Sequence, residues 1–237
     1  MTNPFKIAIY SDGAQLEKMK ASLTTGFVSG FTTNPSLMKA AGITDYWAFA
    51  KEAVATFPDS PLSFEVFADD SATMKKEALK LTELGENVFV KIPVLNTAGE
   101  SSGPLIKELS EAGVQLNITA ITTTAQVKDA VENFAANTTN LVSIFVGRLN
   151  DVGIDTTAFV KESRKLCDTK PGSLLLWAST REVWNIFEAE KQDCDIITVP
   201  PGIIDKLAKL GTTAEEVALD TVKTFQKDID DLGFSIL

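Results

Sequence analysis

The stretch Asn87–Val94, NVFVKIPV, is apolar except for its first residue and a lysine, Lys91, near its middle. A second apolar run, SLLLWAS, covers Ser173–Ser179. Continuous apolar runs of this length are typical of parallel β-strands that helices cover on the outside, whereas half-exposed strands alternate apolar and polar residues. Six further short runs complete a set of predicted strands: Lys6–Asp12, Gly30–Asn34, Leu62–Phe67, Val88–Val94, Gln115–Ile121, Asn140–Arg148, Ser173–Ser179 and Asp195–Pro200.

Amphipathic segments lie between these runs. Ser71–Gly85 has apolar residues at helical spacing and a glycine where the helix should stop. A long terminal helix is expected over Thr212–Leu232, where Thr212 and Thr213 stand as caps ahead of two glutamates. The other predicted helices are Ser102–Gly113, Thr122–Asn137, Asp155–Asp168 and Arg181–Gln192.

Eight strands that alternate with about eight helices predict a parallel sheet with right-handed crossovers. For a chain of 237 residues, such a sheet is expected to close into a single (β/α)8 (TIM) barrel domain over residues 1–237. The alternative is an open, doubly wound sheet. No GxGxxG or GxxxxGK[ST] phosphate loop follows any predicted strand, which argues against that alternative.

Composition narrows the chemistry and the partners. The chain has no histidine, which excludes histidine-based triads, and its two cysteines, Cys167 and Cys194, are too few for the usual zinc sites, so we expect no metal and no cofactor. The net charge of −10 argues against nucleic acid and anionic lipid as partners. No run of 18 apolar residues predicts a membrane span. Few cysteines and no secretory signal favour a reduced, cytoplasmic setting.

Polar residues interrupt the apolar strands near their carboxyl ends, which is where barrel enzymes place their catalytic groups. Each buried polar side chain costs free energy unless it is paired, so such a concentration needs a functional reason. The candidates are Asp12, Thr33, Asn34, Glu65, Lys91, Asn117, Thr119, Ser143, Arg148, Ser179 and Arg181.

Lys91 is the strongest of these candidates. A lysine amid Val90 and Ile92 should face the barrel interior, where desolvation favours the neutral amine, and a neutral amine attacks ketones. Glu65, on the preceding strand, could position or activate water beside it. The alternative for both residues is a structural ion pair.

Four further residues have a functional interpretation and a structural alternative. Asp12 could move a substrate hydroxyl proton or cap the following helix. Asn34, before a proline, could hold hydroxyl groups or cap its helix. Asn117 and Thr119 share one face of a strand and could bind a polyol, although a threonine there can simply bond to backbone.

Arg148 and Arg181 follow neighbouring strands six and seven. Two arginines there can clamp a phosphate group, on the side of the barrel mouth where phosphate often binds. The alternative is a pair of ordinary surface salt bridges.

Six motifs resemble the transaldolase family in their order and spacing: TTNPSLM, SFEV, VFVKIP, LNITAI, SIFVGR and WASTRE. The resemblance covers residues 6 to 205 and is nearest to the compact branch, which includes fructose-6-phosphate aldolases. It implies a Schiff-base enzyme that transfers a dihydroxyacetone unit between sugar phosphates, with a protonated imine in place of a metal.

The resemblance also implies roles. Lys91 matches the Schiff-base lysine, Asp12 the acid/base aspartate, and Glu65 with Thr119 the pair that holds the catalytic water. Arg148 and Arg181 match the phosphate clamp. The remaining matches are placed as substrate contacts: Thr33, Asn34, Asn117, Ser143, Phe145 and Ser179.

Two rival functions remain. An aldolase of the same branch would release free dihydroxyacetone, but Glu65 and Phe145 are of the transaldolase type, where the aldolases carry glutamine and tyrosine. A non-catalytic sugar-phosphate binder would have no need of Lys91. Compact relatives assemble into rings, so a homo-oligomer is expected as one possible state, and the apolar tail Phe234–Leu237 could dock on its own barrel or on a neighbour.

Overall fold

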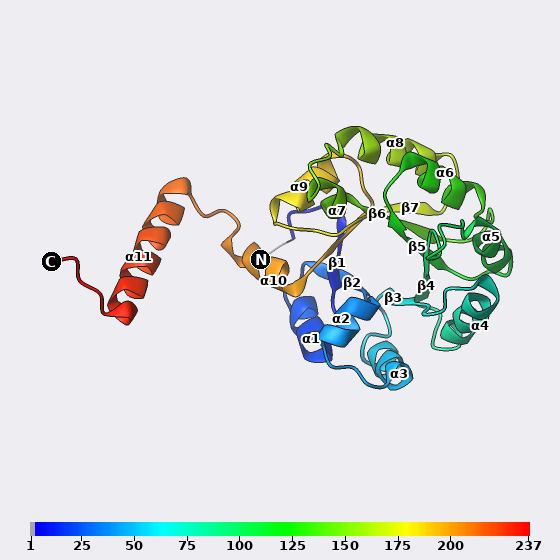
Figure 1. The fold of residues 1–237 in the computed structure, drawn as a ribbon, viewed down its shortest axis with the longest axis horizontal. Coiled ribbons are helices and arrows are strands. Elements are labelled where there is room, and N and C mark those ends of the chain that lie inside the picture. The colour runs from blue at the N-terminus through cyan, green and yellow to red at the C-terminus, as the bar shows by residue number, and fades with distance from the viewer. Residues whose placement is uncertain (1–2) are drawn as a thin grey trace.

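A computed structural model describes residues 3–237 and contains a closed barrel of eight parallel strands in sequential order, with β8 paired to β1 (Figure 1). This confirms the predicted (β/α)8 architecture. The strands are β1 Ala8–Asp12, β2 Val28–Thr32, β3 Leu62–Glu65, β4 Val88–Pro93, β5 Leu116–Ile121, β6 Asn140–Phe145, β7 Ser173–Ala178 and β8 Ile196–Val199.

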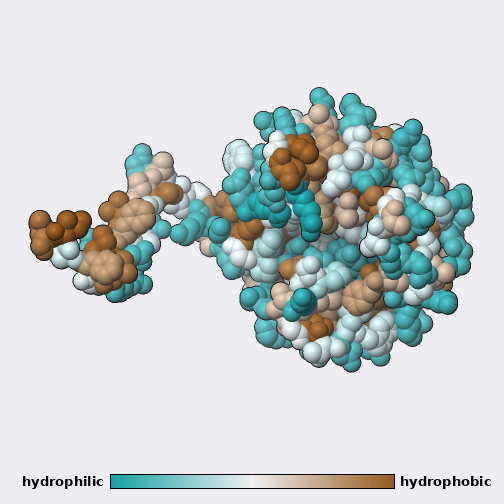
Figure 2. All heavy atoms as spheres, viewed as in Figure 1, coloured by the Kyte–Doolittle hydropathy of each residue, from teal (hydrophilic) through white to brown (hydrophobic). Residues whose placement is uncertain are grey.

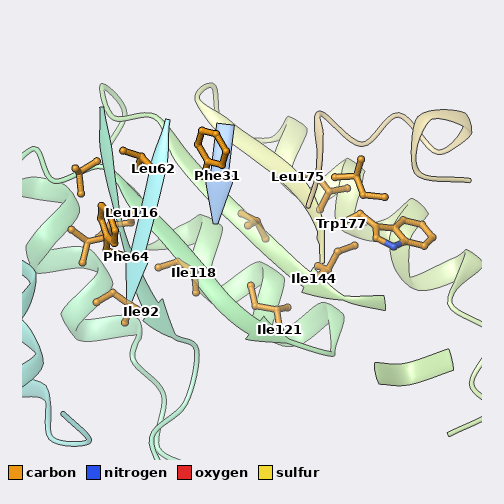
Figure 3. Close-up of a cluster of buried hydrophobic side chains, with 14 of the residues drawn as sticks. Phe31, Leu62, Phe64, Ile92, Leu116, Ile118, Ile121, Ile144, Leu175 and Trp177 are labelled. Carbon is orange, nitrogen blue, oxygen red and sulfur yellow. The ribbon is translucent and has the colours of Figure 1, made fainter. Parts of the chain in front are cut away.

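Side chains along each strand alternate between the barrel interior and the layer beneath the helices. The outer set, which includes Phe31, Phe64, Ile92 and Trp177, forms the main apolar core (Figure 3). The inner set forms a smaller cluster low in the barrel, built around Tyr10, Phe89, Leu141, Leu176 and Ile196. Both sets are apolar, which explains why the strands have continuous apolar runs.

Helices surround the barrel. They are α1 Leu16–Thr24, α2 Pro35–Ala40, α3 Tyr46–Thr56, α4 Ser71–Thr82, α5 Gly103–Glu111, α6 Thr124–Glu132, α7 Val146–Asn150, α8 Thr157–Asp168, α9 Trp184–Lys191, α10 Pro201–Ile204, the 3₁₀ helix η1 Asp205–Lys209 and α11 Ala214–Leu232. Of these described helices, none has the length and apolar content that a membrane span needs.

Six of the predicted strands end one to three residues earlier than expected, and two of these differences affect the cavity. Strand β2 closes at Thr32 rather than Asn34, because Asn34 accepts the Leu37 N–H and caps α2, with Pro35 in its first turn. Strand β6 closes at Phe145, so Arg148 lies on the short helix α7 rather than on the strand. Both corrections move side chains at the mouth of the barrel.

Helix α11 stands apart from the barrel and carries the C-terminus away from it (Figure 1). Thr213 and Glu216 form a complete capping box at its start, which confirms the predicted cap, and Gly233 ends it in the left-handed conformation. None of its residues is buried. Figure 2 shows apolar side chains gathered along this helix and the tail that follows it.

Candidate active site

A cavity of about 740 Å³ opens at the carboxyl ends of the strands. All of the predicted site residues except Thr33 line it. They come from β1 and β3 to β6, from the loops that follow β2 and β7, and from α7. The barrel therefore brings together residues that are far apart in the sequence, as expected for the mouth of this fold.

Lys91 lies in the wall of this cavity, and its side chain is only 7% exposed. The register of β3 and β4 places it directly opposite Glu65. Its Nζ lies 3.1 Å from Glu65 Oε2 and donates to the carbonyl of Thr33 at 2.7 Å. The ion pair that was one alternative is therefore present, but it lies in the cavity, where both groups can reach a ligand.

Asp12 ends β1 across the cavity mouth, half-buried. The Thr32 hydroxyl donates to Asp12 Oδ1 at 2.7 Å and lies 2.5 Å from the Thr198 hydroxyl. Burial raises the pKa of Asp12, although the Lys91 ammonium and the Thr32 hydrogen bond oppose that shift. A carboxyl with a raised pKa both accepts and returns a proton near neutral pH more readily than an ordinary aspartate.

Asn117 and Ser143 line the cavity as a hydrogen-bonded polar pair. Asn117 Nδ2 donates to Ser63 Oγ at 3.0 Å, and the Ser143 hydroxyl donates to Asn117 Oδ1 at 2.6 Å. The register also places Asn117 opposite Lys91. These buried amide and hydroxyl groups are held in place before any ligand arrives.

Thr119 is different, because its buried Oγ1 has no hydrogen-bond partner among the described residues. A buried hydroxyl without a partner costs free energy that a water molecule or ligand hydroxyl would recover. Ala120, which follows it, has a φ of 62° and also lines the cavity. The bend this produces shifts the β5–β6 register beyond Ile118.

The arginine side of the cavity is formed by α7 and the loop after β7. The Arg148 guanidinium lies 5.5 Å from the centre of the Phe145 ring. A Cβ added at Gly147 would sit 1.7 Å from the Ser179 carbonyl oxygen, so only glycine allows these backbones to meet. Ser179 itself has a φ of 68°, an uncommon conformation for a serine.

The structure places one predicted substrate contact elsewhere. Thr33 is fully buried, and its hydroxyl donates to the Ser63 carbonyl rather than pointing into the cavity. Thr32 lines the cavity instead, on the same face of the strand as Gly30, because successive side chains of a strand point to opposite faces.

Sequence reasoning also missed Thr198 and Asp151, which line the cavity. Thr198 is the one polar residue within β8, a signal that could have identified it. Asp151 pairs with Arg181 across two separate segments, and no local pattern indicates that contact. Over residues 3–237, no cluster of three or more histidine, cysteine, aspartate or glutamate side chains is placed to hold a metal ion.

Comparison with known proteins agrees with this geometry. Residues 9–236 match the family described as Transaldolase/Fructose-6-phosphate aldolase. The chain is 37% identical over 199 residues to a probable transaldolase of Methanococcus maripaludis, covering 84% of this chain and 88% of the relative. It is 33% identical over 229 residues to a probable transaldolase of Erythrobacter litoralis, covering 96% of this chain and 99% of the relative.

Solved structures support the fold alone. A dihydrodipicolinate synthase from Rhodopseudomonas palustris aligns with a TM-score of 0.59 at 14% identity, over 93% of this chain and 80% of that one. A native KDPGal structure aligns with a TM-score of 0.57 at 11% identity, over 97% of this chain and 98% of that one.

Proposed function

Because this chain belongs to the transaldolase/fructose-6-phosphate aldolase family, we propose that it is a transaldolase that forms a Schiff base with its ketose substrate. It moves a dihydroxyacetone unit from fructose 6-phosphate or sedoheptulose 7-phosphate to an aldose phosphate, as a step of the pentose phosphate pathway. The observation that carries this proposal is the buried amine of Lys91 in the cavity wall, between the carboxylates of Glu65 and Asp12.

The first step joins Lys91 to the substrate. The Lys91 amine gives up a proton and attacks the ketone carbon, and the resulting carbinolamine loses water to leave a protonated imine. Glu65, 3.1 Å from Nζ, can take up and return protons during this exchange. Together with the unpaired Thr119 hydroxyl it can also hold the departing water molecule.

The second step breaks the carbon–carbon bond. Asp12 takes the proton of the substrate hydroxyl as the bond cleaves and the aldose leaves. The bonding electron pair moves into the protonated imine and forms an enamine on Lys91, so no free carbanion develops. The raised pKa of Asp12 suits this transfer, because the group that accepts the proton must return it to the acceptor aldehyde.

The third step reverses the second with a new partner. The enamine carbon attacks the aldehyde of the incoming aldose phosphate, and hydrolysis of the imine then frees Lys91. Asn34, Asn117, Ser143 and Ser179 line the cavity where the hydroxyl groups of a sugar would lie. Arg148 and Arg181, at its rim, bind the phosphate group.

The test is covalent trapping. Borohydride reduction with fructose 6-phosphate, followed by peptide mass mapping, should place an adduct on Lys91 that is lost in Lys91→Ala. Lys75→Ala, which removes an exposed lysine on α4, is the matched control and should keep the adduct. Absence of an adduct, or an adduct at another lysine, would contradict the proposal.

Transfer is separated from release by following free dihydroxyacetone. With an aldose phosphate acceptor present, group transfer should outpace the release of dihydroxyacetone. Release should rise in Glu65→Gln and Phe145→Tyr, which introduce the residues of the aldolase type. If release is faster than transfer in the unmodified protein, the chain is an aldolase of the same branch.

We further propose that the protein works in the cytoplasm as a homo-oligomer in which α11 packs on a second copy of the chain. The family match extends to residue 236 and so includes this helix. Its apolar stripe is formed by five residues that are each between 51% and 63% exposed: Leu219, Val222, Phe225, Ile229 and Leu232. Packed in this way, residues 1–237 would act as one domain per subunit.

A further inference from the structure

We infer that Asp151 is a positioning residue, which holds the Arg181 guanidinium in the orientation that receives the substrate phosphate. The inference rests on the proposed function, because it assigns the phosphate to this side of the cavity. Asp151 follows the last residue of α7, and Arg181 lies in the loop after β7. Both line the cavity together with Arg148.

The contact between them is two-pronged. Arg181 Nε lies 3.1 Å from both carboxylate oxygens of Asp151, and Arg181 Nη2 donates to Asp151 Oδ2 at 2.5 Å. Such a fork fixes the plane of a guanidinium as well as its position. The main chain is held too, because the Arg181 N–H donates to the side chain of buried Asn185 at 2.9 Å.

Stability is a weak explanation for this pair. The side chains of Arg181 and Asp151 are 47% and 50% exposed, and exposed ion pairs contribute little to folding. A role in binding fits better, because the pair lies at the rim of the cavity beside a second arginine. That arginine, Arg148, also helps to lower the pKa of Asp151, after the larger effect of the Arg181 hydrogen bond.

The geometry leaves one edge of Arg181 free. Guanidinium carries five N–H groups, and the carboxylate engages Nε and one hydrogen of Nη2. The second Nη2 hydrogen and the adjacent Nη1 hydrogen form the outer edge, and no described residue accepts from Nη1. That edge is the two-donor fork that a phosphate binds.

Two effects of Asp151 on phosphate oppose each other. Its negative charge repels the anion, while its hydrogen bonds orient the donor. The site is open to solvent, so screening weakens the repulsion, whereas the directional fork depends on short contacts. Orientation should therefore dominate, and removal of the carboxylate should weaken phosphate binding.

The test uses Asp151→Asn, which keeps the shape of the side chain and removes its charge. KM for fructose 6-phosphate should rise about five- to tenfold, and KM for unphosphorylated fructose should stay nearly constant. The matched control is Asp155→Asn, an exposed aspartate nearby that accepts from Thr157 and does not line the cavity, and it should leave both values unchanged.

A double-variant comparison separates positioning from a general structural role. In an Arg181→Ala background, Asp151→Asn should have no further effect on KM for the phosphorylated sugar. A persistent effect, an equal rise for both sugars, or a fall in KM for fructose 6-phosphate would overturn the inference.

Calorimetry with glucitol 6-phosphate and glucitol makes the test independent of turnover, because neither ligand has a ketone. Weaker binding of the phosphorylated ligand alone in Asp151→Asn would support the inference even if Lys91 forms no adduct. Unchanged binding would overturn it while leaving the transaldolase proposal intact.

Discussion

The barrel and helix α11 have equally clear apolar patterns, but they differ in what covers them. In the barrel, side chains such as Phe64 and Ile92 lie between strands and helices and are fully buried. On α11, Phe225 and Ile229 repeat at helical spacing with more than half of each side chain exposed. The difference shows that an apolar pattern indicates that an element has a surface to bury. The pattern does not indicate whether the same chain or another molecule covers that surface.

Helix α11 gains little conformational stability from its own length. Isolated helices shorter than about 12–15 residues are marginal in water, so the 19 residues of α11 place it only a little above that limit, and a good N-terminal cap adds only about 1 kcal/mol. The capping box at Thr213 and the glycine stop at Gly233 define its ends but bury nothing. The barrel, in contrast, is held by cooperative packing of two apolar layers. Substitutions in the two regions should therefore have different consequences.

The largest expected difference concerns lysines. Lys91→Ala in the barrel should lower kcat by at least about a thousandfold, because the covalent intermediate loses its amine. Lys223→Ala on α11 should leave steady-state turnover within about twofold. Turnover with fructose 6-phosphate and an aldose phosphate acceptor checks both, and comparable losses in the two variants would break the contrast.

Next in size is the cost of removing a phenylalanine. Phe64→Ala should destabilise the barrel by about 3–5 kcal/mol, because it leaves a cavity in a fully buried layer. Phe225→Ala at low protein concentration should cost less than about 1 kcal/mol, since its ring is exposed within the subunit. Urea denaturation measures both. A large cost for Phe225 in dilute, dissociated protein would mean that α11 packs on its own barrel.

Charged substitutions in the apolar stripe of α11 test whether a second copy of the chain covers that stripe. The double substitution Val222→Asp with Ile229→Asp should dissociate the oligomer, because it places two carboxylates in the buried interface. Sedimentation velocity reports the mass and circular dichroism the retained fold. Lys223→Asp, on the polar side of the helix, is the matched control and should leave the mass unchanged. If the unsubstituted protein sediments as a monomer, the proposal that α11 packs on a second copy of the chain is wrong.

The smallest expected effect is a shift in pH dependence. Since burial raises the pKa of Asp12, its proton is lost at higher pH in the folded protein than in the unfolded chain. The acid limb of kcat should therefore lie above the usual range of an aspartate, and the cost of burying the charged form should grow as pH rises through the folded pKa. Asp12→Asn should remove this limb from the residual rate, while Asp220→Asn on α11 should keep it.

Much of the barrel could be predicted from local sequence. Apolar runs located all eight strands, and the polar interruption at Lys91 marked a lysine that lies buried in the cavity wall, because burial of a lysine needs a reason. The prediction for Thr33 did not allow for the alternation of side chains along a strand. Thr32 and Thr33 are neighbours and face opposite sides, and it is Thr32 that lines the cavity.

The sequence by itself determined the positions of the eight strands and of the longer helices between them, the amphipathic character of those helices and the chemistry available to the chain, because periodicity and side-chain type are local properties. Only the tertiary structure decided which groups meet. Closure of the barrel places the Lys91 ammonium close to Thr33 and Glu65, and the loop after β7 brings Arg181 to Asp151. It also leaves α11 uncovered by the rest of the chain, because contact depends on how distant segments pack, and no local pattern contains that information.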